Sequence, residues 1–133
     1  MSKDLMEEIV YVGSININIY KSISKDIDSD KVIITKERIN HINTRHNNDY
    51  KIYSSYIADI LKSPDFILES NKPHTAFILK YFIKNNKKFQ LILRIHTKND
   101  RPKYENSIIT LLKISEKKWN KYLRNKKILY KHE

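Results

Sequence analysis

The stretch Thr75–Ile95, TAFILKYFIKNNKKFQLILRI, decides the fold. Two runs rich in apolar residues, 75–84 and 88–97, flank Asn85 and Asn86. Asparagine tolerates the positive φ values of tight turns better than most residues do. Apolar residues in runs of this length on both sides of a turn are typical of paired strands. The stretch therefore predicts a β-hairpin.

The length of the hairpin loop decides which side chains share a face of the sheet. A loop with an even number of residues would place Lys80 among the apolar neighbours of Leu91, where burying an ammonium group costs several kcal/mol. A loop with an odd number places Lys80 beside Ile92 and Arg94 instead. We therefore predict the odd loop, which gives the sheet an apolar face beneath the helices. The other face would then bear Lys80, Arg94 and His96.

The hydrophobic period along the rest of the chain predicts an α+β fold in one domain, 1–133, in which residues 1–12 are an unassigned N-terminal extension. The predicted strands are 9–23, 32–34, 66–69, 75–84, 88–97 and 107–114, with an extended tail at 127–131. The predicted helices are 36–46, capped by Thr35, 50–62, and a short one that Ser115 caps. The arrangement expected is N-terminal helices packed on a roughly four-stranded antiparallel sheet. A polar loop is expected at 98–105.

The composition excludes several classes of protein. The chain has 133 residues, no cysteine and one glycine, Gly13. Without cysteine there is neither a disulfide nor a thiolate nucleophile. A single glycine excludes both the G-x-G-x-x-G and the Walker phosphate loops, so no nucleotide cofactor is expected. No apolar run reaches 18 residues and no signal-peptide pattern opens the chain, which predicts a cytoplasmic protein without a membrane span.

The net charge of +11 is distributed unevenly. Residues 1–70 hold nine Lys and Arg against eleven Asp and Glu, whereas residues 71–133 hold seventeen against four. A basic half predicts a polyanionic partner, most commonly nucleic acid. Ile, Asn, Lys and Tyr make up 65 residues, so part of the lysine content fits drift in an A/T-rich genome. Drift does not explain the asymmetry, and we predict nucleic-acid contacts by Arg94, His96 and Lys113.

The segment Thr35–His46, TKERINHINTRH, gathers side chains suited to proton transfer and phosphate binding. On a helix His46 lies near the stripe of Ile39 and Ile42, while His41 and Arg45 share a more exposed face. The alternatives are a hydrogen-bonded histidine at the edge of the core for His46 and a plain surface histidine for His41. The segment has neither His-x-x-x-His spacing nor a carboxylate beside the pair at helical spacing, so no metal site is predicted.

Two hydroxyl groups, of Ser107 and Thr110, lie in the segment Asn106–Thr110, NSIIT. In a regular strand the two side chains point to opposite faces, so a joint role requires a bulge. The alternative is the β-propensity of threonine and a turn role for serine.

The order of these motifs resembles the phage-associated nucleases of the barnase–EndoU–colicin–RelE-like (BECR) fold. The resemblance covers residues 12–131 and lies in the following order of residues. It comprises Gly13, Thr35-x-x-Arg38-Ile-x-His41-Ile-x-x-Arg45-His46, Pro64-Asp65-Phe66-Ile67, Thr75-x-x-x-x-Lys80, Leu91-Ile-Leu-Arg94, Asn106-Ser107-Ile108-Ile109-Thr110 and Leu129-Tyr130-Lys131.

The resemblance implies a metal-independent endoribonuclease that uses the 2′-hydroxyl of RNA as nucleophile. The candidate catalytic residues that it implies are His41, Arg45, His46, Lys80, Ser107 and Thr110, with Arg94 as a further candidate. We expect His46 to transfer a proton as general base or acid, with His41 as its partner if the helix end lets the two side chains converge. Otherwise Lys80 or water completes the proton relay, and the basic residues stabilise the phosphorane. The alternative is a non-catalytic basic module that binds nucleic acid. A toxin-type nuclease with an acidic immunity protein or antitoxin as partner is also compatible with the sequence.

Overall fold

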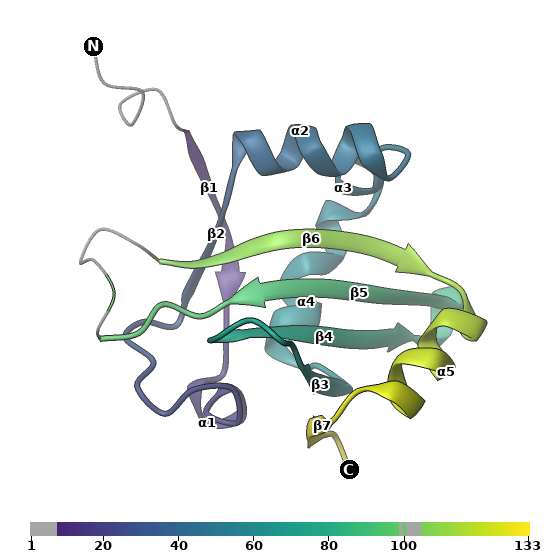
Figure 1. Cartoon of the computed structure of the whole chain (residues 1–133). Coiled ribbons are helices and arrows are strands. Elements are labelled where there is room, and N and C mark those ends of the chain that lie inside the picture. Colours follow the sequence, from purple (N-terminus) through teal and green to yellow (C-terminus); the bar gives the residue numbers. More distant parts are fainter. Residues whose placement is uncertain (1–7, 99, 101–104) are drawn as a thin grey trace.

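The computed structural model describes residues 8–98, 100 and 105–133 (Figure 1). Most of the predicted loop 98–105 and the first seven residues of the predicted extension lie outside this part. The described strands are β1 (Ile9–Ser14), β2 (Lys31–Thr35), β3 (Phe66–Glu69), β4 (Thr75–Phe82), β5 (Lys87–Arg94), β6 (Asn106–Ile114) and β7 (Ile128–Lys131). The described helices are α1 (Ile17–Tyr20), α2 (Lys36–Arg45), α3 (Asp49–Tyr53), α4 (Ile57–Lys62) and α5 (Glu116–Asn125), with 3₁₀ turns η2 (Ser54–Tyr56) and η3 (Ile83–Asn85).

One seven-stranded sheet orders the described strands as β1-β2-β6-β5-β4-β3-β7. Its centre is the antiparallel meander β3-β4-β5-β6 that the hydrophobic pattern predicts. The predicted strand number was too low, because β1 and β2 extend the sheet on the β6 side and β7 pairs with β3. The α+β class is confirmed, but the helices are not confined to the N-terminal part, because α5 follows β6.

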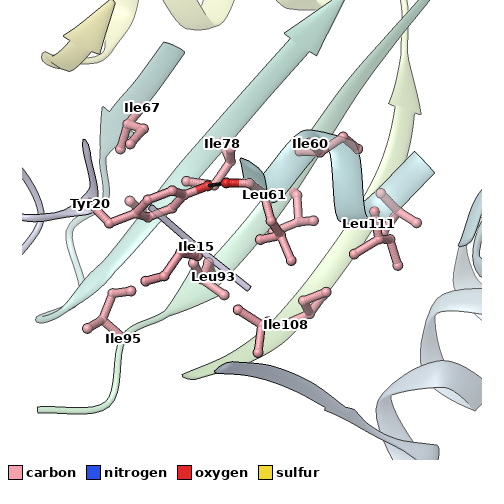
Figure 2. Close-up of a cluster of buried hydrophobic side chains, with 14 of the residues drawn as sticks. Ile15, Tyr20, Ile60, Leu61, Ile67, Ile78, Leu93, Ile95, Ile108 and Leu111 are labelled. Atoms are coloured by element: carbon pink, nitrogen blue, oxygen red, sulfur yellow. Dashed lines mark hydrogen bonds between the residues drawn. The ribbon is translucent and has the colours of Figure 1, made fainter. Parts of the chain in front are cut away.

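The predicted strand 9–23 is wrong beyond Ser14. The chain turns there into the one-turn helix α1, whose start Asn16 caps by accepting a hydrogen bond from Asn18 N at 3.1 Å. Tyr20 at its end is fully buried, and its hydroxyl donates to the carbonyl of Leu61 at 2.8 Å (Figure 2). A capped turn and a buried tyrosine anchor thus override the alternating isoleucines.

The main hydrophobic core lies between the sheet and helices α2 and α4. Buried side chains of α4, Ile60 and Leu61, pack there with Ile78, Leu93 and Leu111 of the sheet (Figure 2). Ile42 of α2 belongs to the same core. We call this side of the sheet the helix-covered face. The predicted helix 50–62 is divided into α3, η2 and α4. The division occurs where two tyrosine rings of this segment pack on the ring of Phe89.

The predicted odd hairpin loop is wrong. Lys80 is paired with Phe89, and the four residues 83–86 connect the strands, with Asn86 at a φ of +50°. Lys80 therefore shares the helix-covered face with Phe89, while Ile92 and Arg94 point to the opposite face. Its ammonium group avoids the cost of full burial because Nζ reaches Asp65 Oδ1 at 3.5 Å and 19% of the side chain stays exposed.

The opposite side of the sheet is only partly covered. Trp119 of α5 packs there with Leu79 and Ile114, which closes one end of this side. Over the rest of β4, β5 and β6 no helix of the described residues lies in front of the sheet (Figure 1). We call this side the open face. Its side chains on the central strands include Phe77, Gln90, Ile92, Arg94, Ser107, Thr110 and Leu112.

Candidate active site on the open face

A β-bulge in β6 brings the two predicted hydroxyl groups to one face. Thr110 is opposite Ile92 and Ile108 is opposite Leu93, so Ile109 is the extra residue on β6. The extra residue reverses the alternation of side chains, and Ser107 and Thr110 both point to the open face. Ser107 is the register partner of Arg94. The bulge that the sequence required for a joint role is therefore present.

The guanidinium group of Arg94 is held in place at the end of β5. It donates to the carbonyl of Ile95 at 2.7 Å and to both carboxylate oxygens of Asp100 at 3.2 and 3.3 Å. Asp100 also accepts from the backbone N–H of Thr97 at 2.8 Å. The Thr97 N–H, together with Arg94, holds the pKa of the Asp100 carboxyl well below its usual range. Asp100 is thus ionised near neutral pH and orients Arg94 beside Ser107.

Helix α2 lies next to the β6 edge of this face. Thr35 caps it as predicted, accepting from Arg38 N at 3.1 Å, and the helix then runs alongside β6 (Figure 1). The following corner, where Asn47 and Asn48 have positive φ, is tied to β6 because Asp49 Oδ2 accepts from Lys113 N at 3.0 Å. The C-terminal half of α2 is therefore fixed relative to β6.

The three candidate residues of α2 do not share one environment. His41 and Arg45 are exposed, as predicted. His46 is half-buried at the C-cap, where its backbone N–H donates to the Ile42 carbonyl at 2.8 Å. Taking Ile42 as the buried reference, His41 and Arg45 lie about 100° and 60° around the helix in one sense. His46 lies about 40° around in the other sense, which separates the two histidines by about 140°.

Two of the residues predicted to contact RNA, His96 and Lys113, do not lie on the open face beside Arg94. His96 is 1% exposed, its N–H donates to Asn106 Oδ1 at 2.7 Å, and its Nδ1 lies 3.3 Å from Asp28 Oδ2. The imidazole is therefore enclosed by the protein, and an RNA contact by His96 stays a prediction. Lys113 is exposed and lies on β6 opposite Phe89, on the helix-covered side of the register.

Sequence reasoning assigned no role to two residues that hold this site together. Asn106 is fully buried, and its Nδ2 donates to the carbonyls of Ser29 and Lys31 at 2.6 and 2.8 Å. It therefore fixes the start of β6 against Ser29 in the loop before β2 and against Lys31 at the start of β2. The other residue is Asp100, which holds the Arg94 guanidinium group. In the sequence, only its position six residues after Arg94 indicates that the two could be neighbours. Lys80, in contrast, lies on the other face of the sheet and is not brought together with Arg94, Ser107 and Thr110.

The described residues contain neither a membrane-length apolar helix nor a cluster of three or more His, Asp or Glu side chains that could hold a metal ion. What the open face offers is one oriented guanidinium group and two hydroxyl groups, beside a helix that carries further basic side chains. In a chain with a net charge of +11, this is a surface typical of proteins that bind nucleic acid.

A comparison with protein-family models identifies the family. The model described as phage-Barnase-EndoU-ColicinE5/D-RelE like nuclease2 matches residues 11–131, nearly the whole chain. The chain therefore belongs to this family of nucleases, and the resemblance that the motifs indicate is confirmed. Neither the curated proteins nor the solved structures give a match.

Proposed function

We propose that the protein is an endoribonuclease that cuts RNA without a metal ion, by attack of the 2′-hydroxyl on the adjacent phosphorus. The observation that carries this proposal is the bulge in β6, which presents Ser107 and Thr110 on the same face as Arg94. Three donors directed to one side of a sheet suit the non-bridging oxygens of a phosphate. Membership of a nuclease family makes nucleic acid the expected substrate.

In the proposed reaction a bond forms between the 2′-oxygen and phosphorus, and the bond from phosphorus to the 5′-oxygen breaks. The attacking hydroxyl loses a proton, and the leaving oxygen gains one. Arg94 and Arg45 stabilise the negative charge of the phosphorane, and the hydroxyls of Ser107 and Thr110 donate to its oxygens. Lys80 takes no part, because it points to the helix-covered face and pairs with Asp65.

For the proton transfer we favour His41 over His46. Ile42 points from α2 into the core on the helix-covered face, and α2 runs in the same direction as β6 (Figure 1). On a right-handed helix in this orientation, the side of Ile42 that carries His41 and Arg45 turns toward the open face. The side that carries His46 turns toward α3. His41 then accepts the proton of the 2′-hydroxyl, and water supplies the proton for the 5′-oxygen.

The experiment compares two histidines of one helix. His41→Ala should lower the rate of RNA cleavage roughly 10²–10⁴-fold, the range for loss of a proton-transferring group. His46→Ala is the matched control and should cost less than about 10-fold. Equal loss in both variants would contradict the choice of His41. RNA binding without cleavage by the unaltered protein would favour the non-catalytic binding module, and loss of cleavage in EDTA would contradict the metal-independent mechanism.

A further inference from the structure

A second concentration of positive charge lies on α5 and the two residues that follow it. Between residues 116 and 127 one acidic residue, Glu116, stands against six basic residues, which are Lys117, Lys118, Lys121, Arg124, Lys126 and Lys127. All six except the half-buried Lys126 are exposed. Glu116 forms an ion pair with Lys88 of β5 at 3.7 Å, so its carboxylate is directed to the sheet.

The two lysines in the first turn of α5 are unfavourably placed with respect to the helix dipole. Cations stabilise the last turn of a helix, where Arg124 lies, and destabilise the first turn. Lys117 and Lys118 lie in that first turn, after the N-cap Ser115 and Glu116. Both lysines therefore oppose the helix dipole. Lys118 also lies near the Tyr122 ring, with Nζ 5.7 Å from its centroid.

The lysines surround a shallow hollow of about 310 Å³. Its lining is Ser115, Lys117, Lys118, Lys121 and Tyr122. The Tyr122 ring stacks on Phe77 with centroids 5.6 Å apart and planes at 30°. Phe77 belongs to the open face, so this aromatic pair joins the hollow to the face that carries the proposed site.

The distance between the two places suits one RNA strand. Phe77 is paired with Ile92, and Ile92 is paired with Thr110. At about 4.8 Å between neighbouring strands, Phe77 lies about 10 Å from Thr110 across the sheet. A single strand of a few nucleotides spans such a gap, and aromatic rings beside basic side chains are the usual surface for single-stranded nucleic acid.

We propose that α5 is a docking surface for the RNA strand that the open face cuts. Lys117, Lys118 and Lys121 bind phosphates to one side of the scissile bond, around the hollow that they line with Tyr122. The inference rests on the proposed function, since it assigns the substrate a path from the catalytic residues across Phe77 to α5. It assigns α5 to affinity and leaves the chemical step to the open face.

The test measures binding to a fluorescent single-stranded RNA of about a dozen nucleotides, made uncleavable by 2′-O-methyl groups. The triple variant K117Q/K118Q/K121Q is compared with K25Q/K51Q/K62Q, which loses the same charge at exposed positions on other segments. The α5 variant should bind at least about 10-fold more weakly. The slope of the logarithm of affinity against the logarithm of salt concentration should become about 2 less steep in the α5 variant. Each lost phosphate contact on a single strand contributes about 0.7 to this slope. The control should change affinity less than about 3-fold.

Equal weakening in both triple variants would overturn the proposal, because net charge alone would then account for binding. Unchanged affinity in the α5 variant would overturn it too, and would leave the basic surface to an acidic protein partner. Circular dichroism confirms that each variant is folded. Because the RNA is uncleavable, the test can succeed where the proposed chemistry fails, which keeps the two outcomes distinguishable.

Discussion

At the scale of single residues, the side chain of Asn106 connects three segments of the chain through hydrogen bonds. Its side chain accepts a buried hydrogen bond from the backbone N–H of His96 and donates to the partly buried carbonyls of Ser29 and Lys31. Asn106→Ala removes these three hydrogen bonds, at about 1–3 kcal/mol for each one that water does not replace. We expect a loss of about 2–4 kcal/mol in the free energy of unfolding in urea. Ser107→Ala, next in sequence and half-exposed, should cost less than about 0.5 kcal/mol, and equal losses would contradict this role.

Lys80 and Arg94 provide a second prediction at this scale. Arg94→Gln should lower kcat by about 10² or more, because it removes a charge that stabilises the transition state. Lys80→Gln should leave kcat within about 3-fold, since Lys80 points away from the open face. The kcat values of both variants are measured by steady-state kinetics on the same RNA oligonucleotide and compared with that of the unaltered protein. A loss in Lys80→Gln as large as in Arg94→Gln would restore Lys80 to the site and contradict the assignment.

Several properties of single residues could be predicted from the sequence, and others could not. The caps Thr35 and Ser115 and the exposure of His41 and Arg45 follow from local rules that hold along one helix. The face of Lys80 could not be predicted, because a carboxylate 15 residues away in the sequence offers its ammonium group a partner at the edge of the core. Long-range contacts of that kind leave no local pattern.

At the scale of elements, Gly13 shapes the β1 strand. Its φ is +153°, a value that residues with a Cβ rarely adopt, and the register with β2 shifts beside it. An added Cβ would also lie 3.4 Å from Ala58 Cα and Leu61 Cδ1 of α4. Gly13→Ala should therefore lower the free energy of unfolding by about 1–3 kcal/mol, as urea denaturation would show. An unchanged stability would mean that β1 relaxes freely against α4.

The elements themselves were predictable where a long hydrophobic period runs through them, as in α2, β4 and β6. The bulge at Ile109 was not, because the choice between a regular and a bulged strand depends on the partner β5. From the sequence, only a condition could be predicted: Ser107 and Thr110 act together if the strand is irregular. The four-residue strand β7 was predicted as extended, but its pairing with β3 has no local signal.

At the scale of the whole molecule, sheet order determines what the candidate residues can do together. The sequence predicts a basic second half, and the fold places Arg94 of this half on the open face and a cluster of its lysines on α5. The four-stranded sheet became one of seven because β2 pairs in parallel with β6 over Val32 and Ile33, a contact between distant segments. That extension places α2, which follows β2 directly, beside β6.

The most direct test of the central claim uses an RNA oligonucleotide with one 2′-deoxyribose at the mapped cleavage position, together with its all-ribose counterpart, both in EDTA. Attack by the 2′-hydroxyl predicts that the all-ribose RNA is cut and yields a 2′,3′-cyclic phosphate, identified by mass spectrometry. The substituted RNA should bind with similar affinity and remain intact at that position. Cleavage of the substituted RNA there, or loss of all cleavage in EDTA, would contradict the mechanism.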